Sequence, residues 1–155
     1  MKKNFLLIFI FYLSLIVSSY GAATSGDASS SNYDKGASLI KKAKKLESKG
    51  KIEKANKRYE KAFEYLIKSN EKNPNQADTL NYLGFALRKL GNFEEAEKYY
   101  LQGLSIKPDH NGINEYLGEL YIQTNRIELA KERLEVLKNC KCEEYDELKE
   151  LIESN

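Results

Sequence analysis

The sequence predicts an all-α fold, a short right-handed solenoid of about three helix-turn-helix repeats that ends in a capping helix. The chain is 31% charged, has two prolines and no tryptophan, and this composition is typical of exposed helices. Its residues also pair at an offset of 34, which indicates repeated helical hairpins. Finally, Gly84 and Gly91 interrupt a stretch of strong helix formers, although glycine in a helix interior costs about 1 kcal/mol relative to alanine.

Residues 1–23 have the pattern of a secretory signal peptide. A basic head is followed by an apolar run at residues 5–17 and then by small residues, and we expect cleavage after Gly21 or Ala23. The run is shorter than the roughly 20 apolar residues that span a bilayer. The sequence therefore predicts a periplasmic or secreted bacterial protein. An uncleaved signal anchor that tethers the chain to the membrane is the alternative.

Residues 24–33 are rich in Ser and Thr and predict a flexible tether before a domain at residues 34–155. Charge is divided along that domain, with a net +7 over residues 34–73 and a net −6 over residues 74–155. Solvated helix faces explain such a division. The alternative is a basic end that meets an acidic partner, an anionic lipid or the acidic end of a second copy.

The 34-residue offset pairs large residues with large ones and small with small. The pairs are Leu83 with Leu117, Gly84 with Gly118, Phe93 with Ile127, Ala96 with Ala130, and Tyr100 with Leu134. We expect Gly84 and Gly118 to let the two helices of each hairpin approach closely. Gly91 pairs with Asn125, and both residue types favour the left-handed conformation that ends a helix.

These residues resemble the tetratricopeptide repeat family. Residues 77–110 match its pattern at Leu80, Leu83, Gly84, Leu87, Ala96, Tyr100, Gly103 and Pro108. Residues 111–142 match more loosely, because Asn114 and Cys142 stand where a large apolar residue and a proline are expected. The resemblance implies a solenoid whose first helices line a concave groove for an extended peptide or a partner helix.

A degenerate repeat at residues 36–76 precedes these two. Its closing proline arrives seven residues late, so we expect a second helix, about residues 51–72, that is two turns longer than its counterparts. That helix should partly expose Phe63, Tyr65 and Ile67. Residues 143–154 are amphipathic and predict a helix that seals the apolar face of the last repeat, using Tyr145, Leu148 and Ile152 against Leu134 and Leu137.

No catalytic motif, phosphate loop or dinucleotide fingerprint occurs in the sequence, so we expect no enzyme activity and no cofactor. The one histidine, His110, follows Asp109, which we expect to cap the next helix rather than to act in a general-base pair. The near-neutral charge of the mature chain also disfavours nucleic acid as a partner.

Cys140 and Cys142 are the only cysteines. In an oxidising compartment we expect them to form a disulfide that fixes the turn before the capping helix. A redox-active pair is an alternative, because a strained disulfide is easier to reduce. Zinc would need two further ligands, which the neighbouring sequence lacks, so no metal site is expected.

The resemblance implies groove positions in each first helix. They are Asp78, Asn81, Phe85, Arg88 and Lys89 in the middle repeat, then Gly112, Glu115, Glu119, Ile122 and Gln123 in the last. The first repeat would add Ala37, Ile40, Lys44, Glu47 and Ser48. We expect this groove to run from basic to acidic, with Phe85 either as a hydrophobic anchor or packed against the neighbouring repeat.

Chaperone-binding members of the family hold a C-terminal carboxylate in a clamp of Lys, Asn and Arg. The matching positions here are Ile40, Lys44, Tyr82, Gly112 and Tyr116, so that recognition is not expected. The sequence predicts instead a non-enzymatic interaction module, an adaptor or assembly factor of the cell envelope. The alternatives are a self-assembling structural envelope protein and a thiol-disulfide role at the cysteine pair.

Overall fold

The computed structural model describes residues 31–155, and the expected signal peptide and most of the expected tether lie outside these residues. The described part forms seven helices and no strand, which confirms the all-α prediction. The helices are α1 (Asn32–Glu47), α2 (Ile52–Lys72), α3 (Ala77–Lys89), α4 (Phe93–Ile106), α5 (Asn111–Gln123), α6 (Ile127–Leu137) and α7 (Glu143–Glu153). Over the described range, none of these helices is both long and apolar enough to cross a membrane.

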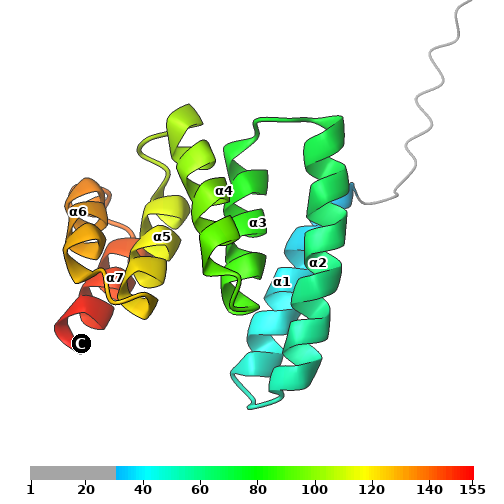
Figure 1. Ribbon diagram of the computed structural model, residues 1–155, viewed down its shortest axis with the longest axis horizontal. Coiled ribbons are helices and arrows are strands. Elements are labelled where there is room, and N and C mark those ends of the chain that lie inside the picture. The colour runs from blue at the N-terminus through cyan, green and yellow to red at the C-terminus, as the bar shows by residue number, and fades with distance from the viewer. Residues whose placement is uncertain (1–30) are drawn as a thin grey trace, which may run out of the picture.

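The helices pair into three hairpins, α1 with α2, α3 with α4, and α5 with α6, which stand side by side in a row (Figure 1). The first helices α1, α3 and α5 contact one another in succession, and α7 packs against α5 and α6 at the C-terminal end. This arrangement confirms the expected solenoid of three repeats with an added terminal helix.

Residues with positive φ end the first helix of each repeat. Gly50, Gly91 and Asn125 have φ angles of +69°, +83° and +58° and stand at equivalent positions. The expectation for Gly91 and Asn125 is therefore confirmed, since both adopt the left-handed conformation. At the other end of α1, the side chain of Ser31 caps the helix. Helix α1 thus begins inside the stretch 24–33 that the sequence assigned to the tether.

The middle repeat packs as its glycine predicts. A Cβ built on Gly84 would lie 2.6 Å from the Tyr100 ring, and Tyr100 is fully buried. In the last repeat the same reasoning is wrong, because a Cβ built on Gly118 would lie 2.6 Å from the side chain of Leu148 of α7 and would not meet Leu134 first. Leu134 is a smaller side chain than Tyr100 and is only half-buried. The space beside Gly118 is therefore filled by the terminal helix.

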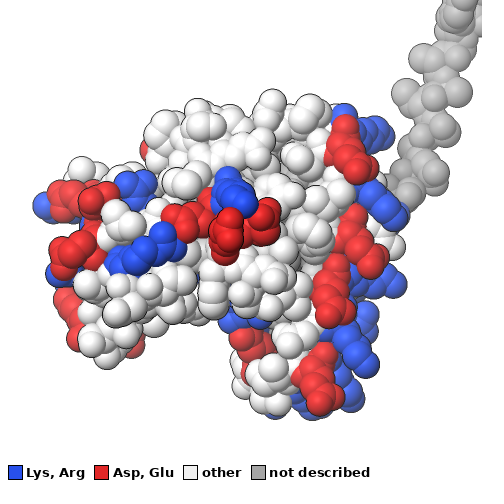
Figure 2. Space-filling model, viewed as in Figure 1, with Lys and Arg blue, Asp and Glu red and all other residues white. Residues whose placement is uncertain are grey.

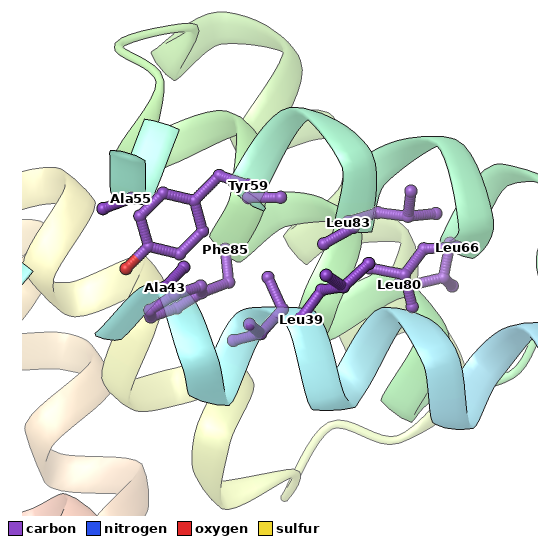
Figure 3. Packing of buried hydrophobic residues seen from close by; sticks show 11 residues of the cluster. Leu39, Ala43, Ala55, Tyr59, Leu66, Leu80, Leu83 and Phe85 are labelled. Atoms are coloured by element: carbon purple, nitrogen blue, oxygen red, sulfur yellow. The ribbon is translucent and has the colours of Figure 1, made fainter. Parts of the chain in front are cut away.

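The first repeat joins the second through a shared apolar core. Figure 3 shows side chains from α1, α2 and α3 converging, among them Leu39, Ala43, Ala55, Tyr59, Leu66, Leu80, Leu83 and Phe85. Helix α2 has 21 residues, against 14 in α4 and 11 in α6, so the expected extra length is present. Phe63 on α2 is half-buried, and its ring packs edge-on against Tyr99, with the ring centroids 6.5 Å apart.

Ion pairs join consecutive repeats. Glu97 of α4 pairs with Arg126 at 2.7 Å, and the guanidinium of Arg126 lies 4.6 Å from the centroid of the Tyr121 ring. His110, which immediately precedes α5, contacts Asp78 of α3 at 2.9 Å. His110 also accepts a hydrogen bond from the backbone N–H of Ile113 and so caps α5. The expectation that Asp109 caps this helix is therefore wrong.

The division of charge along the sequence reaches the surface. In the face shown in Figure 2, lysine and arginine side chains gather along the outer edge of α2, beside acidic side chains of the same helix. On the N-terminal repeat, a depression around Tyr65 is lined by Lys35, Lys42, Arg58 and Lys61. The ammonium groups of Lys35 and Lys68 each lie 5.9 Å from the centroid of the Tyr65 ring.

Candidate functional site

A groove of about 420 Å³ opens between the first helices of the three repeats and α7. Its walls come from α1, α3, α5 and α7, so four separate segments of the sequence must pack correctly to form it. We refer to this space as the groove, defined by Lys44, Glu47, Phe85, Arg88, Lys89, Glu115, Tyr116, Glu119, Glu147, Glu150, Leu151 and Ser154.

Aromatic rings form the centre of the groove. Phe85 lies between Tyr59 and Tyr116, with ring centroids 5.9 and 4.7 Å away. The ammonium group of Lys44 is 5.6 Å from the centroid of the Phe85 ring and 5.8 Å from that of Tyr116, which are cation–π distances. Phe85 is only 3% exposed. It therefore acts mainly as packing between neighbouring repeats, while the half-buried Tyr116 offers more surface.

Two cations of the groove are neutralised by partners inside the protein. Arg88 is 3% exposed and donates to a carboxylate oxygen of Glu119 at 2.7 Å. Lys89 pairs with Glu47 across the junction of the first two repeats. Burial acts to raise the pKa of Glu47, but hydrogen bonds from Lys89 and Tyr59 outweigh it and lower that pKa. The basic end that the sequence predicts for the groove is thus largely compensated.

Glu115 is the most unusual carboxyl group of the groove. It is 3% exposed, and burial, a hydrogen bond with Glu147 and the nearby charges of Glu119, Glu147 and Glu144 raise its pKa from 4.5 to about 9. The raised pKa favours the protonated form of Glu115 at neutral pH. Deprotonating it would place a charge in a poorly solvated site beside other carboxylates.

The structure brings seven of the fifteen predicted groove positions together, namely Lys44, Glu47, Phe85, Arg88, Lys89, Glu115 and Glu119. The other eight do not line the groove. In the first repeat Ile40 is buried in the apolar core, Ala37 is partly buried and Ser48 is exposed. Asp78 binds His110, Asn81 is buried next to Gly112, Ile122 packs into the apolar core, and Gln123 accepts a hydrogen bond from Arg88.

The sequence reading missed the contribution of α7 to the groove. The sequence pattern places this helix on the apolar face of α6, which α7 does contact, but Leu148 of α7 also seats against Gly118 of α5. The next face of α7 then turns Glu147, Glu150, Leu151 and Ser154 toward the groove. A signal for this exists in the sequence, since Leu134 replaces the tyrosine that fills the space beside the equivalent glycine in the middle repeat.

Cys140 and Cys142 form a disulfide in the turn that joins α6 to α7. Lys141 between them has a φ of +51°. Within the range of residues that the structure covers, no group of three or more His, Cys, Asp or Glu side chains has the arrangement of a metal site.

Comparison with curated proteins finds a partial relative. The chain is 34% identical over 74 residues to the human protein O-mannosyl-transferase TMTC3 and 33% identical over 73 residues to the mouse protein. The human match covers 48% of this chain and 8% of that protein. The likeness thus concerns a small segment of a much longer enzyme.

Comparison with solved structures confirms the fold. The type III secretion translocator chaperone SycD of Yersinia enterocolitica matches with a TM-score of 0.55 and 17% identity, over 78% of this chain and 83% of that one. A tetratricopeptide repeat protein of Parabacteroides merdae matches with a TM-score of 0.54 and 18% identity, over 79% and 59% of the two chains.

The family itself is identified by a sequence model. The tetratricopeptide repeat model matches residues 32–109, a segment that contains α1 to α4 and therefore the first two hairpins. The third hairpin continues the 34-residue period and packs against the second in the same manner. The chain belongs to the tetratricopeptide repeat family.

Proposed function

We propose that the protein is a non-enzymatic interaction module that holds a peptide segment or a partner helix in the groove. The observation that carries this proposal is the groove itself, which combines an aromatic centre with charged walls and remains open between four helices. Binding sites on proteins commonly join apolar surface with a few placed polar groups in this way. Family membership supports the same function, because stacked helical repeats create extended concave surfaces.

We further propose that the protein works in the bacterial cell envelope, as an adaptor or assembly factor, after export to the periplasm or the exterior. The support is the signal-peptide pattern of residues 1–23. The cysteine pair is in keeping with an oxidising compartment, where disulfides persist. A chain retained by an uncleaved signal anchor would present the same groove on the outer side of the inner membrane.

Site-specific photocrosslinking in cells tests the interaction function. The photoreactive amino acid p-benzoylphenylalanine replaces Leu151, which lines the groove and is 38% exposed, or Leu101 on α4, which is 49% exposed. These are matched positions, because both are exposed leucines on helices. We expect covalent adducts with a partner from position 151 and none of the same adducts from position 101.

Two outcomes of this experiment contradict the proposal. Equal adduct patterns from both positions would mean that the groove has no preference over the outer surface. Adducts consisting only of two copies of this chain would favour the alternative, a self-assembling structural protein.

A further inference from the structure

The charges of the groove do not balance. Five carboxyl groups and three cations line it, and two of the cations are used in the ion pairs of Arg88 with Glu119 and of Lys89 with Glu47. Lys44 then remains opposite the carboxyl groups of Glu115, Glu147 and Glu150. Lys44 forms no ion pair with any residue that the structure describes, and it lies instead over the two aromatic rings.

The excess carboxyl groups are concentrated between α5 and α7. Glu115 comes from the inner face of α5, while Glu147 and Glu150 come from the α7 face that turns toward the groove. Within residues 31–155, no lysine or arginine lies within ion-pair distance of Glu115 or Glu147. A buried carboxyl group without a cation is costly to ionise, and Glu115 is 97% shielded from solvent.

We infer that the groove selects a partner segment bearing an arginine or lysine side chain, which enters between α5 and α7 and pairs with Glu115 and Glu147. This inference rests on the proposed function, since it names the chemistry of the segment that the groove holds. An arginine fits the site best, because its planar guanidinium has five N–H donors and can serve two carboxylates at once. Its arrival compensates the charge that Glu115 acquires when it ionises beside Glu147.

Apolar surface beside the carboxyl groups indicates a peptide rather than a small cation. Leu151 at the groove wall is 38% exposed, and Tyr116, which also lines the groove, is half-buried. A segment that places an apolar side chain beside its arginine would cover both residues. A polyamine or an inorganic cation would leave them exposed to water.

Peptide selection tests this inference with the full chain as bait. A phage library of random twelve-residue peptides is panned on the protein, and the enriched sequences are synthesised with each arginine or lysine replaced by a neutral analogue, citrulline in the case of arginine. We expect the enriched peptides to share a cationic residue next to an apolar one. Fluorescence anisotropy should show that the peptide with the neutral analogue, the neutral twin, binds at least about tenfold more weakly than the cationic peptide. A loss of this size is expected when a charge-assisted hydrogen bond is removed.

Variants locate the bound cation. Glu115→Gln and Glu147→Gln are each expected to weaken the binding of the cationic peptide. Glu143→Gln is the matched control, because Glu143 is exposed on α7 and does not line the groove. Glu115→Gln keeps the shape of the side chain, and glutamine is neutral like the protonated form that the raised pKa of Glu115 favours at pH 7. The variant should therefore fold, and a circular dichroism melt checks that it does.

The pH dependence adds a readout that a purely structural role would not change. Binding of a cation requires ionised Glu115, so the affinity of the wild type should rise between pH 6 and pH 9, and the Glu115→Gln variant should lose this rise. The other charged or titratable groups that face Glu115 are Tyr116 and Glu119 of α5, Glu144 and Glu147 of α7, Arg88 of α3, Tyr100 of α4 and, across the groove, Lys44 of α1. Arg133 of α6 contacts Asn114 and Glu132 instead.

The inference is overturned if the enriched peptides lack a cation, if the neutral twin binds equally, or if no peptide depends on Glu115 and Glu147. The proposed function is judged separately by crosslinking from position 151. A partner crosslinked there through a neutral or acidic segment would uphold the interaction function and overturn this inference.

Discussion

Truncation of the chain after Lys141 is expected to lower the melting temperature by about 10 °C, because removing α7 uncovers apolar surface worth roughly 3 kcal/mol. Leu148 is fully buried against Gly118, and Leu137 of α6 is 1% exposed. Both the cavity beside Gly118 and the apolar face of the last repeat would then meet water. Differential scanning calorimetry measures the fall, and sedimentation should show aggregation that grows with concentration.

A point substitution separates the effect of losing the Leu148 side chain from the effect of removing the whole of helix α7. Leu148→Ala should cost about 2 kcal/mol, the lower end of the usual range for a leucine truncated in a core and less than removal of the whole helix. Asp146→Ala is the control, since Asp146 is exposed on the same helix. Truncation should also abolish binding in the groove, because Glu147, Glu150 and Leu151 are removed with the helix. A truncated protein that stays monomeric and equally stable would show that α7 is not part of the fold.

Glu115→Gln is expected to make the protein more stable than the wild type at pH 9 and about equally stable at pH 5. The pKa of Glu115 is raised by burial from 4.5 to about 9. A carboxyl group whose pKa is raised by folding stabilises the folded state fully below its unfolded pKa, and this contribution is lost as pH rises through the folded pKa. The wild type should thus lose up to about 1.4 kcal/mol per pH unit across this interval.

Chemical denaturation at pH 5, 7 and 9 measures this difference. The slope of stability against pH should be flatter in the Glu115→Gln variant, which cannot take up or release the proton. Glu143→Gln provides the control, because that side chain is exposed at the start of α7. Parallel slopes in the wild type and the Glu115→Gln variant would mean that Glu115 is ionised normally in the folded protein.

The helical hairpins could be predicted because their signals are local. Gly91 and Asn125 end helices within their own repeat, and the Gly84 and Tyr100 contact lies inside one hairpin. The extra length of α2 followed from counting residues to its closing proline. Such features depend on the spacing of residues along the chain, and the 34-residue period repeats that spacing.

The composition of the groove was less predictable, because it depends on which charged side chains form ion pairs with one another in the folded protein. The position of Arg88 on the inner face followed from the repeat, but its burial and its pairing with Glu119 are tertiary facts. Likewise, the amphipathic pattern of α7 does not say that this helix packs against α5 as well as α6. The contact of Leu148 with Gly118 decides this, and it turns Glu147 into the groove.

The central claim is that partners bind in the groove, on the inner faces of α1, α3, α5 and α7. Nuclear magnetic resonance of the ¹⁵N-labelled full chain tests it most directly, by titration with the partner segment that crosslinks to position 151. We predict that amide shift changes cluster around Lys89, Glu119 and Leu151, all of which line the groove. Changes confined to the outer helices α2, α4 and α6, for example around Lys57, Leu101 and Lys131, would contradict the claim.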